Sequence, residues 1–167
     1  LKVADLATSL YDQLQLHGLL AGLTVDDRRT LAAAAYLHDI GASPRAHLEA
    51  SPLPQWAKAF SEPDRHGEIS FHVLRSRIID SSSDRQLATL SPQARSMLLY
   101  CLLWHASPTE FVLDIEPLFD LHRTRLLAGI LRIADGLDYD HRGRVREVRL
   151  HRASVWLRLL AHSITPV

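Results

Sequence analysis

Histidine and aspartate side chains stand at positions where the sequence predicts the buried faces of helices. The chain has ten histidines but one cysteine in 167 residues. His38 follows Leu31 by seven positions and Ala34 by four, so it continues an apolar helical stripe. Asp39, His105 and Asp135 continue similar stripes. A buried carboxylate needs a partner, and a divalent cation satisfies carboxylates and imidazoles together. These positions therefore predict a metal site.

Each of these residues also has an ordinary interpretation. A single buried histidine is usually a hydrogen-bonded core residue, and an aspartate near a helix end is often a cap or half of an ion pair. Arg132 lies three residues before Asp135 and offers such a pair. A His-Asp pair before Gly41 is also a common polar helix end. The occurrence on three helices favours a metal site, but spacing alone leaves both interpretations open.

The elements that must position these side chains are mostly helices. Apolar periodicity and turn residues predict helices over 3–16, 24–37, 65–80, 91–104 and 118–137. The segment 91–104 is apolar almost all round, which is typical of a buried central helix. Residues 51–63 contain three prolines and are expected to be mostly loop. Residues 145–150 and 155–160 allow a short C-terminal β-hairpin. The fold class is therefore all-α, a helical bundle in a single domain over 1–167.

Composition excludes several classes of function. Lys+Arg and Asp+Glu are 19 each, so the net charge is zero, and nucleic acid and anionic membranes are not expected partners. No apolar run is long enough to span a bilayer, and the first residues do not resemble a signal peptide. The single Cys101 excludes an internal disulfide and a thiolate zinc cluster, and it suggests the cytoplasm. The apolar central helix leaves a homodimer open.

Four segments resemble a known superfamily, and they occur in its order. They are AAAAYLHDIG around His38 and Asp39, RHGEISFHVL with His66, LLWHASP with His105, and LAGILRIADGLDYDHRGRV with Asp135. Together they resemble the HD superfamily of metal-dependent phosphohydrolases over nearly the whole chain. The last segment and the opening VADLATSLYDQL are similar to the HD-like C-terminal domain of exopolyphosphatases and guanosine pentaphosphate phosphatases. This resemblance implies an HD-type bundle, which is then the C-terminal part of a longer protein of that kind.

The resemblance also implies a reaction and residue roles. The reaction is hydrolysis of a phosphate ester or anhydride in a nucleotide or polyphosphate, with a divalent cation (Mn, Fe, Co, Ni or Mg) that activates water. His38, Asp39 and Asp135 would hold one cation, and Asp39 would bridge to a second at His66 and His105. Asp39 and His66 are the residues assigned to catalysis. Candidate phosphate contacts are the guanidinium groups of Arg65, Arg132, Arg142 and Arg144.

Two departures from the family pattern leave an alternative function open. The family has a first metal-ligating histidine at the start of its first helix, whereas Leu1, Lys2 and Val3 offer no ligand and His17 lies too far along. The exopolyphosphatase branch carries its chemistry on an actin-like part that nothing in this chain resembles. The alternative is therefore a non-catalytic accessory domain that binds polyphosphate or mediates dimerisation. The retained His-Asp, His, His and Asp series favours the active enzyme.

Overall fold

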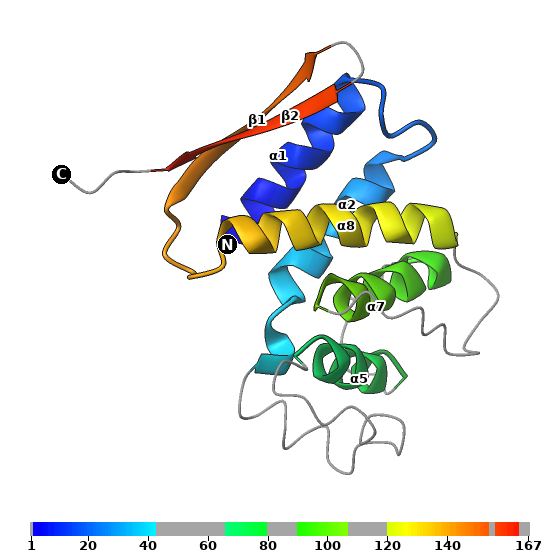
Figure 1. The fold of residues 1–167 in the computed structure, drawn as a ribbon. Coiled ribbons are helices and arrows are strands. Elements are labelled where there is room, and N and C mark those ends of the chain that lie inside the picture. The colour runs from blue at the N-terminus through cyan, green and yellow to red at the C-terminus, as the bar shows by residue number, and fades with distance from the viewer. Residues whose placement is uncertain (1, 43–65, 80–89, 107–119, 154–155, 164–167) are drawn as a thin grey trace.

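The expected all-α bundle is confirmed in the computed structural model (Figure 1), which describes residues 2–42, 66–79, 90–106, 120–153 and 156–163. The helices are α1 (Lys2–Leu16), α2 (Val25–Leu37), the short 3-10 helix η1 (Ile40–Ala42), α5 (His66–Ile79), α7 (Pro92–Ala106) and α8 (Leu121–Leu137). The strands are β1 (Val145–Ala153) and β2 (Trp156–Ser163). The predicted helix ends at 65, 80 and 118 lie outside the described residues.

Helix α7 is the centre of the bundle, as its apolar sequence predicts. It packs against α2, α5 and α8, while α1 packs against α2 and α8. Figure 1 shows α8 crossing in front of α2, with α5 at the far side of α7. Leu98, Cys101 and Leu102 of α7 are fully buried. None of the helices in the described segments is both long and apolar enough to cross a membrane.

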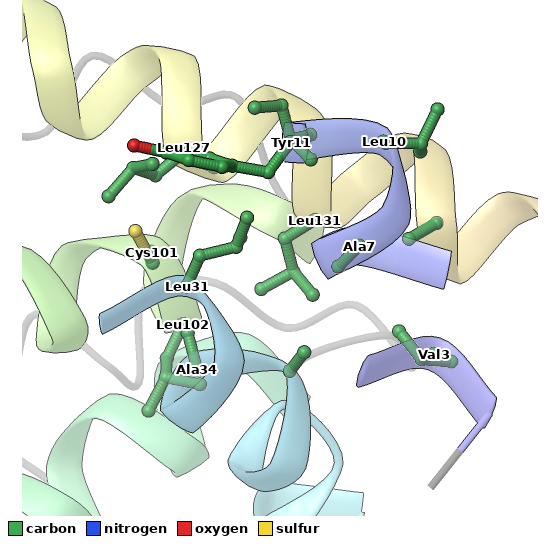
Figure 2. Close-up of a cluster of buried hydrophobic side chains, with 14 of the residues drawn as sticks. Val3, Ala7, Leu10, Tyr11, Leu31, Ala34, Cys101, Leu102, Leu127 and Leu131 are labelled. Atoms are coloured by element: carbon green, nitrogen blue, oxygen red, sulfur yellow. The ribbon is translucent and has the colours of Figure 1, made fainter. Parts of the chain in front are cut away.

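The apolar stripes of α1, α2, α7 and α8 meet in one core (Figure 2). Leu31, Leu127 and Leu131 are fully buried, and Leu10 and Tyr11 of α1 close over them. Burying a leucine side chain contributes roughly 1.5–3 kcal/mol relative to leaving it in water, so this core fixes how the helices cross. Because His38 and Asp135 continue the stripes of Leu31 and Leu131, the same packing carries them toward each other.

The start of α2 is tied to α1 and α8 by polar contacts around Asp27. Thr24 and Asp27 form a capping box, in which the Asp27 carboxylate accepts the Thr24 backbone N–H at 2.6 Å. Arg123 of α8 forms an ion pair with the same buried carboxylate. Tyr11 of α1 donates its hydroxyl to the Thr24 carbonyl at 2.8 Å. Asp27 therefore ties α2 to α8, and Thr24 ties it to α1, at the end of α2 remote from His38.

The C-terminal strands form the antiparallel hairpin that the sequence allowed. Strand β1 pairs with β2 from Val145 opposite Ser163 to Ala153 opposite Trp156, so both strands are longer than predicted. Val148 and Leu150 of β1 are buried against the bundle. The hairpin lies beside α1 in Figure 1.

Helix α1 covers the edge of β1 that does not pair with β2. The side-chain amide of Gln13 donates to the Val148 carbonyl and accepts the Leu150 N–H, both at 2.7 Å. The His17 ring donates from Nε2 to the Leu150 carbonyl at 3.1 Å. The Gln13 amide therefore makes the two backbone hydrogen bonds that a neighbouring strand would otherwise make, and His17 has a structural role.

Candidate metal centre

The His38-Asp39 pair stands at a corner where α2 ends and η1 begins. His38 is the C-cap residue of α2 and is 7% exposed, while Asp39 is half-buried. Ser70 of α5 fixes this corner because its buried hydroxyl donates to the His38 carbonyl and accepts the Gly41 N–H, each at 2.9 Å. The corner therefore has a defined backbone position next to α5.

Two glycines let α5 approach the corner and α7 closely. A Cβ atom on Gly41 would lie 2.1 Å from the His66 carbonyl oxygen, so only glycine fits there. A Cβ atom on Gly67 would lie 2.9 Å from both the Leu102 carbonyl and the Ala106 side chain. The first turn of α5 therefore rests on η1 and α7 with no side chain between them, which brings His66 beside the site.

His38 faces the two carboxylates that the sequence assigns to the first cation. Its Nε2 atom lies 3.1 Å from Asp39 Oδ2 and 3.3 Å from Asp135 Oδ1. Its Nδ1 lies 2.8 Å from the Ala35 carbonyl, which can only accept, so Nδ1 must carry a proton. In neutral His38 the lone pair is therefore on Nε2, the atom that faces Asp39 and Asp135.

His66 and His105 form a second pair beside the first. Their Nε2 atoms are 3.1 Å apart. The buried His105 donates from Nδ1 to the Leu102 carbonyl at 2.8 Å, so its neutral ring also has the lone pair on Nε2. The centroid of the His105 ring lies 5.0 Å from that of His66 and 5.5 Å from that of His38. The α7 histidine therefore connects the two pairs.

Burial and contacts shift the pKa values of these residues in opposite directions. Desolvation lowers the pKa of His38, but its contacts with Asp135 and Asp39 outweigh burial and raise that pKa to about 10. The pKa values of Asp39 and Asp135 are lowered, in each case mainly by His38. Burial, reinforced by His66, lowers the pKa of His105 to about 4. The two carboxylates thus favour a positive charge at His38 Nε2, which a proton or a metal cation can supply, whereas burial favours the neutral form of His105.

The donor set fits a divalent cation in kind and in pairwise spacing. Two ligand atoms that are each about 2.1 Å from one ion stand about 3 Å apart when adjacent. The contacts of His38 with the two carboxylates, at 3.1 and 3.3 Å, and the 3.1 Å contact between His66 and His105 match this spacing. The His38 Nε2 atom is buried, and its short contacts are poorly aligned as hydrogen bonds, so it lacks a properly directed partner. Among the described residues, however, no three acidic, histidine or cysteine side chains are already placed to hold one ion. Binding therefore requires side-chain rotation, which partly exposed Asp39 and Asp135 permit.

The candidate phosphate contacts are not gathered at these pairs. Arg65 lies outside the described residues, and Arg132 is exposed on α8 without an ion pair to Asp135 in the described structure. Arg142 and Arg144 are exposed after α8, and their Nε atoms lie 4.0 and 2.9 Å from Asp140 Oδ2. If these arginines bind phosphate, their side chains must turn from the surface toward the two pairs.

The structure adds two residues that the ligand prediction omits. Ser70 holds the His38 corner, and its spacing of four residues from His66 was the signal that both share a face of α5. His141, in the loop after α8, has Nε2 at 3.8 Å from Asp39 Oδ2. The loop that carries His141 is held by Asp138, the C-cap residue of α8, whose carboxylate accepts the Gly143 N–H at 2.8 Å.

Comparison with known proteins identifies the family of the chain. A family model described as HD domain matches residues 1–140, which is most of the chain and includes all the residues of both pairs. No curated protein matches the sequence.

Proposed function

Because the chain belongs to the HD domain family, we propose that it is a metal-dependent phosphohydrolase acting on a phosphate ester or anhydride. The single observation that carries the proposal is His38, whose buried Nε2 faces Asp39 and Asp135 while Nδ1 is fixed by the Ala35 carbonyl. A core histidine kept only for packing needs no pair of carboxylates at its second nitrogen. The oxygen and nitrogen donors favour Mn, Fe, Co, Ni or Mg.

The proposed roles follow the two pairs. His38, Asp39 and Asp135 hold a first cation, and His66 and His105 hold a second that Asp39 also reaches. When bound, a divalent cation supplies Lewis-acid stabilisation of the charge that develops on a phosphoryl oxygen. The backbone bond at His38 Nδ1 orients its ring, and the lowered pKa of Asp39 keeps that carboxylate anionic at neutral pH. Asp39 and His66 stand nearest to the reaction in this assignment.

The proposed substrate is a nucleotide or polyphosphate, bound by the exposed arginines. Arg142 and Arg144 are held near Asp140 in the loop that follows Asp135, so a small side-chain movement would turn them toward an anion. Their segment, LRIADGLDYDHRGRV, also supports a relation to the C-terminal domain of exopolyphosphatases and guanosine pentaphosphate phosphatases. The zero net charge argues against nucleic acid as substrate, and the unpaired Cys101 suits the cytoplasm.

The test is Mn²⁺ binding by isothermal titration calorimetry, followed by hydrolysis assays with bis(p-nitrophenyl) phosphate, pyrophosphate and polyphosphate. Asp39→Ala should weaken Mn²⁺ binding by about 100-fold or more and abolish hydrolysis, because it removes the carboxylate that both proposed cation sites share. Asp26→Ala is the matched control, since Asp26 is an exposed aspartate in the first turn of α2. It should change neither property.

Three results separate the proposal from its alternatives. Metal binding with hydrolysis supports it. Metal or polyphosphate binding without hydrolysis of any substrate would replace it with the accessory-domain function. Failure of the wild-type protein to bind Mn²⁺ would mean that the two pairs are a hydrogen-bonded part of the core.

A further inference from the structure

The loop that follows α8 is fixed around Asp138. The Asp138 residue is buried, and its backbone N–H donates to the Asp135 carbonyl at 3.0 Å. Its own carbonyl accepts the His141 N–H at 2.7 Å, and its carboxylate accepts the Gly143 N–H at 2.8 Å. The backbone on both sides of His141 is therefore tied to one buried residue.

His141 has a backbone conformation that histidine rarely adopts. Its φ angle is 51°, and in the described part of the chain it has the only positive φ outside glycine. This left-handed conformation is unfavourable for a residue with a Cβ atom, and such strain is often found at functional sites. A glycine would fit the turn with less strain, so the turn alone does not explain why a histidine stands there.

The strained turn directs the His141 ring toward Asp39. Nε2 lies 3.8 Å from Asp39 Oδ2, which is too long for a hydrogen bond. The side chain of His141 is 60% exposed and that of half-buried Asp39 is 41% exposed, so a bare ion pair between them contributes little to stability. Two ligands of one ion stand between about 3 and about 4 Å apart, so the separation leaves room for a cation between the two atoms.

We propose that His141 is a further ligand of the cation at Asp39, supplied by the loop after α8. This inference rests on the proposed function, because it adds a ligand to that site. His141 would give the cation at Asp39 a ligand from a third part of the chain, in addition to His38 at the end of α2 and Asp135 in α8. The exposed ring of His141 also places this ligand on the open side of the site, where a phosphate substrate would enter.

The experiment measures Mn²⁺ affinity by calorimetry and the visible spectrum of bound Co²⁺ for wild type, His141→Gly and His141→Asn. Both variants tolerate the left-handed backbone but lack the imidazole. We expect at least about tenfold weaker Mn²⁺ binding in both, a changed Co²⁺ spectrum from the loss of a nitrogen ligand, and an unchanged or higher Tm for metal-free His141→Gly. His122→Ala, at an exposed histidine in the first turn of α8, should match wild type.

The outcomes distinguish this inference from the proposed function. If wild type binds Mn²⁺ and the His141 variants bind it equally well with an unchanged Co²⁺ spectrum, His141 is not a ligand while the proposed function survives. If wild type binds no Mn²⁺, both proposals fail. Weaker binding with the altered spectrum supports the ligand assignment.

Discussion

One hydroxyl group connects the fold to the candidate metal centre. Ser70 is fully buried, and its Oγ atom serves the His38 carbonyl and the Gly41 N–H together. These backbone groups flank Asp39, the residue shared by both proposed cation positions. A buried backbone group without a partner is costly, so the serine also prevents the end of α2 from shifting away from α5. Ser70 is a positioning residue, because its hydroxyl bonds to backbone groups beside Asp39 and not to the side chain of a proposed metal ligand.

Replacing Ser70 by alanine should affect stability and metal binding together. Ser70→Ala leaves two buried backbone groups unpaired, which should lower the free energy of unfolding by about 1–3 kcal/mol in urea denaturation. Mn²⁺ affinity should fall as well, because the backbone of Asp39 is no longer fixed. Thr30→Val is the control: Thr30 is buried in α2 and donates only to the Asp26 carbonyl of its own helix. A stability loss in Ser70→Ala with wild-type Mn²⁺ affinity would contradict the positioning role.

Residue spacing found His38, Asp39, His105 and Asp135, and the family resemblance added His66, but neither showed how these residues pair. The buried stripes of Leu31, Leu98 and Leu131 made the inward position of His38, His105 and Asp135 predictable. Spacing carries no information on ring rotation, so the contact of His38 with both carboxylates appeared only in three dimensions. The approach of His141 was equally hidden, because it depends on a left-handed φ angle that histidine seldom adopts.

At the scale of elements, the site depends on how closely α5 approaches η1 and α7. Gly41 and Gly67 are the contact points, and backbone atoms lie where any side chain would be. Such contacts cannot yield by rotating a flexible neighbour. The position of His66 relative to His105 is therefore set by backbone packing.

A methyl group at one of these contacts should be far more harmful than a methyl group within an exposed helix. Gly41→Ala would place Cβ at 2.1 Å from the His66 carbonyl oxygen and 2.6 Å from the Ser70 nitrogen, so we expect a loss on the order of 4 kcal/mol or more in urea unfolding. Gly129→Ala on the exposed face of α8 meets nothing within 4 Å and should raise stability by about 0.5–1 kcal/mol. Similar effects at the two sites would show that α5 does not rest on η1 as described.

Helices were easier to predict than strands for a physical reason. Thr24 with Asp27 forms the capping box that marks the start of α2, and the apolar period continues to its end. The hairpin depends instead on pairing between distant residues such as Val145 and Ser163, which no local period reveals. The close approach of α5 to η1 and α7 could not be predicted from the sequence either, because a glycine is as typical of a turn as of a close contact between helices.

At the scale of the whole molecule, Cys101 reports on the integrity of the core. It is fully buried in α7 among the leucines of Figure 2, and burial raises the pKa of its thiol. Thiolate is the reactive form of cysteine, so the native protein should not react with Ellman's reagent on the timescale of minutes. In guanidinium chloride the single thiol of the chain should react at once. Rapid reaction under native conditions would mean that α7 is not the centre of the bundle.

The cover that α1 provides for β1 decides in which direction the sheet can be extended. Gln13 and His17 already occupy backbone groups along the outer edge of β1, so a further strand has no place there. Within the described structure, the sheet can gain a strand only alongside β2. If two copies joined through their β2 strands, each end of the combined sheet would be a β1 strand whose outer edge is covered by α1. Association through the sheet would then stop at a closed pair with twofold symmetry, and the growth of an open fibre by strand addition would be blocked.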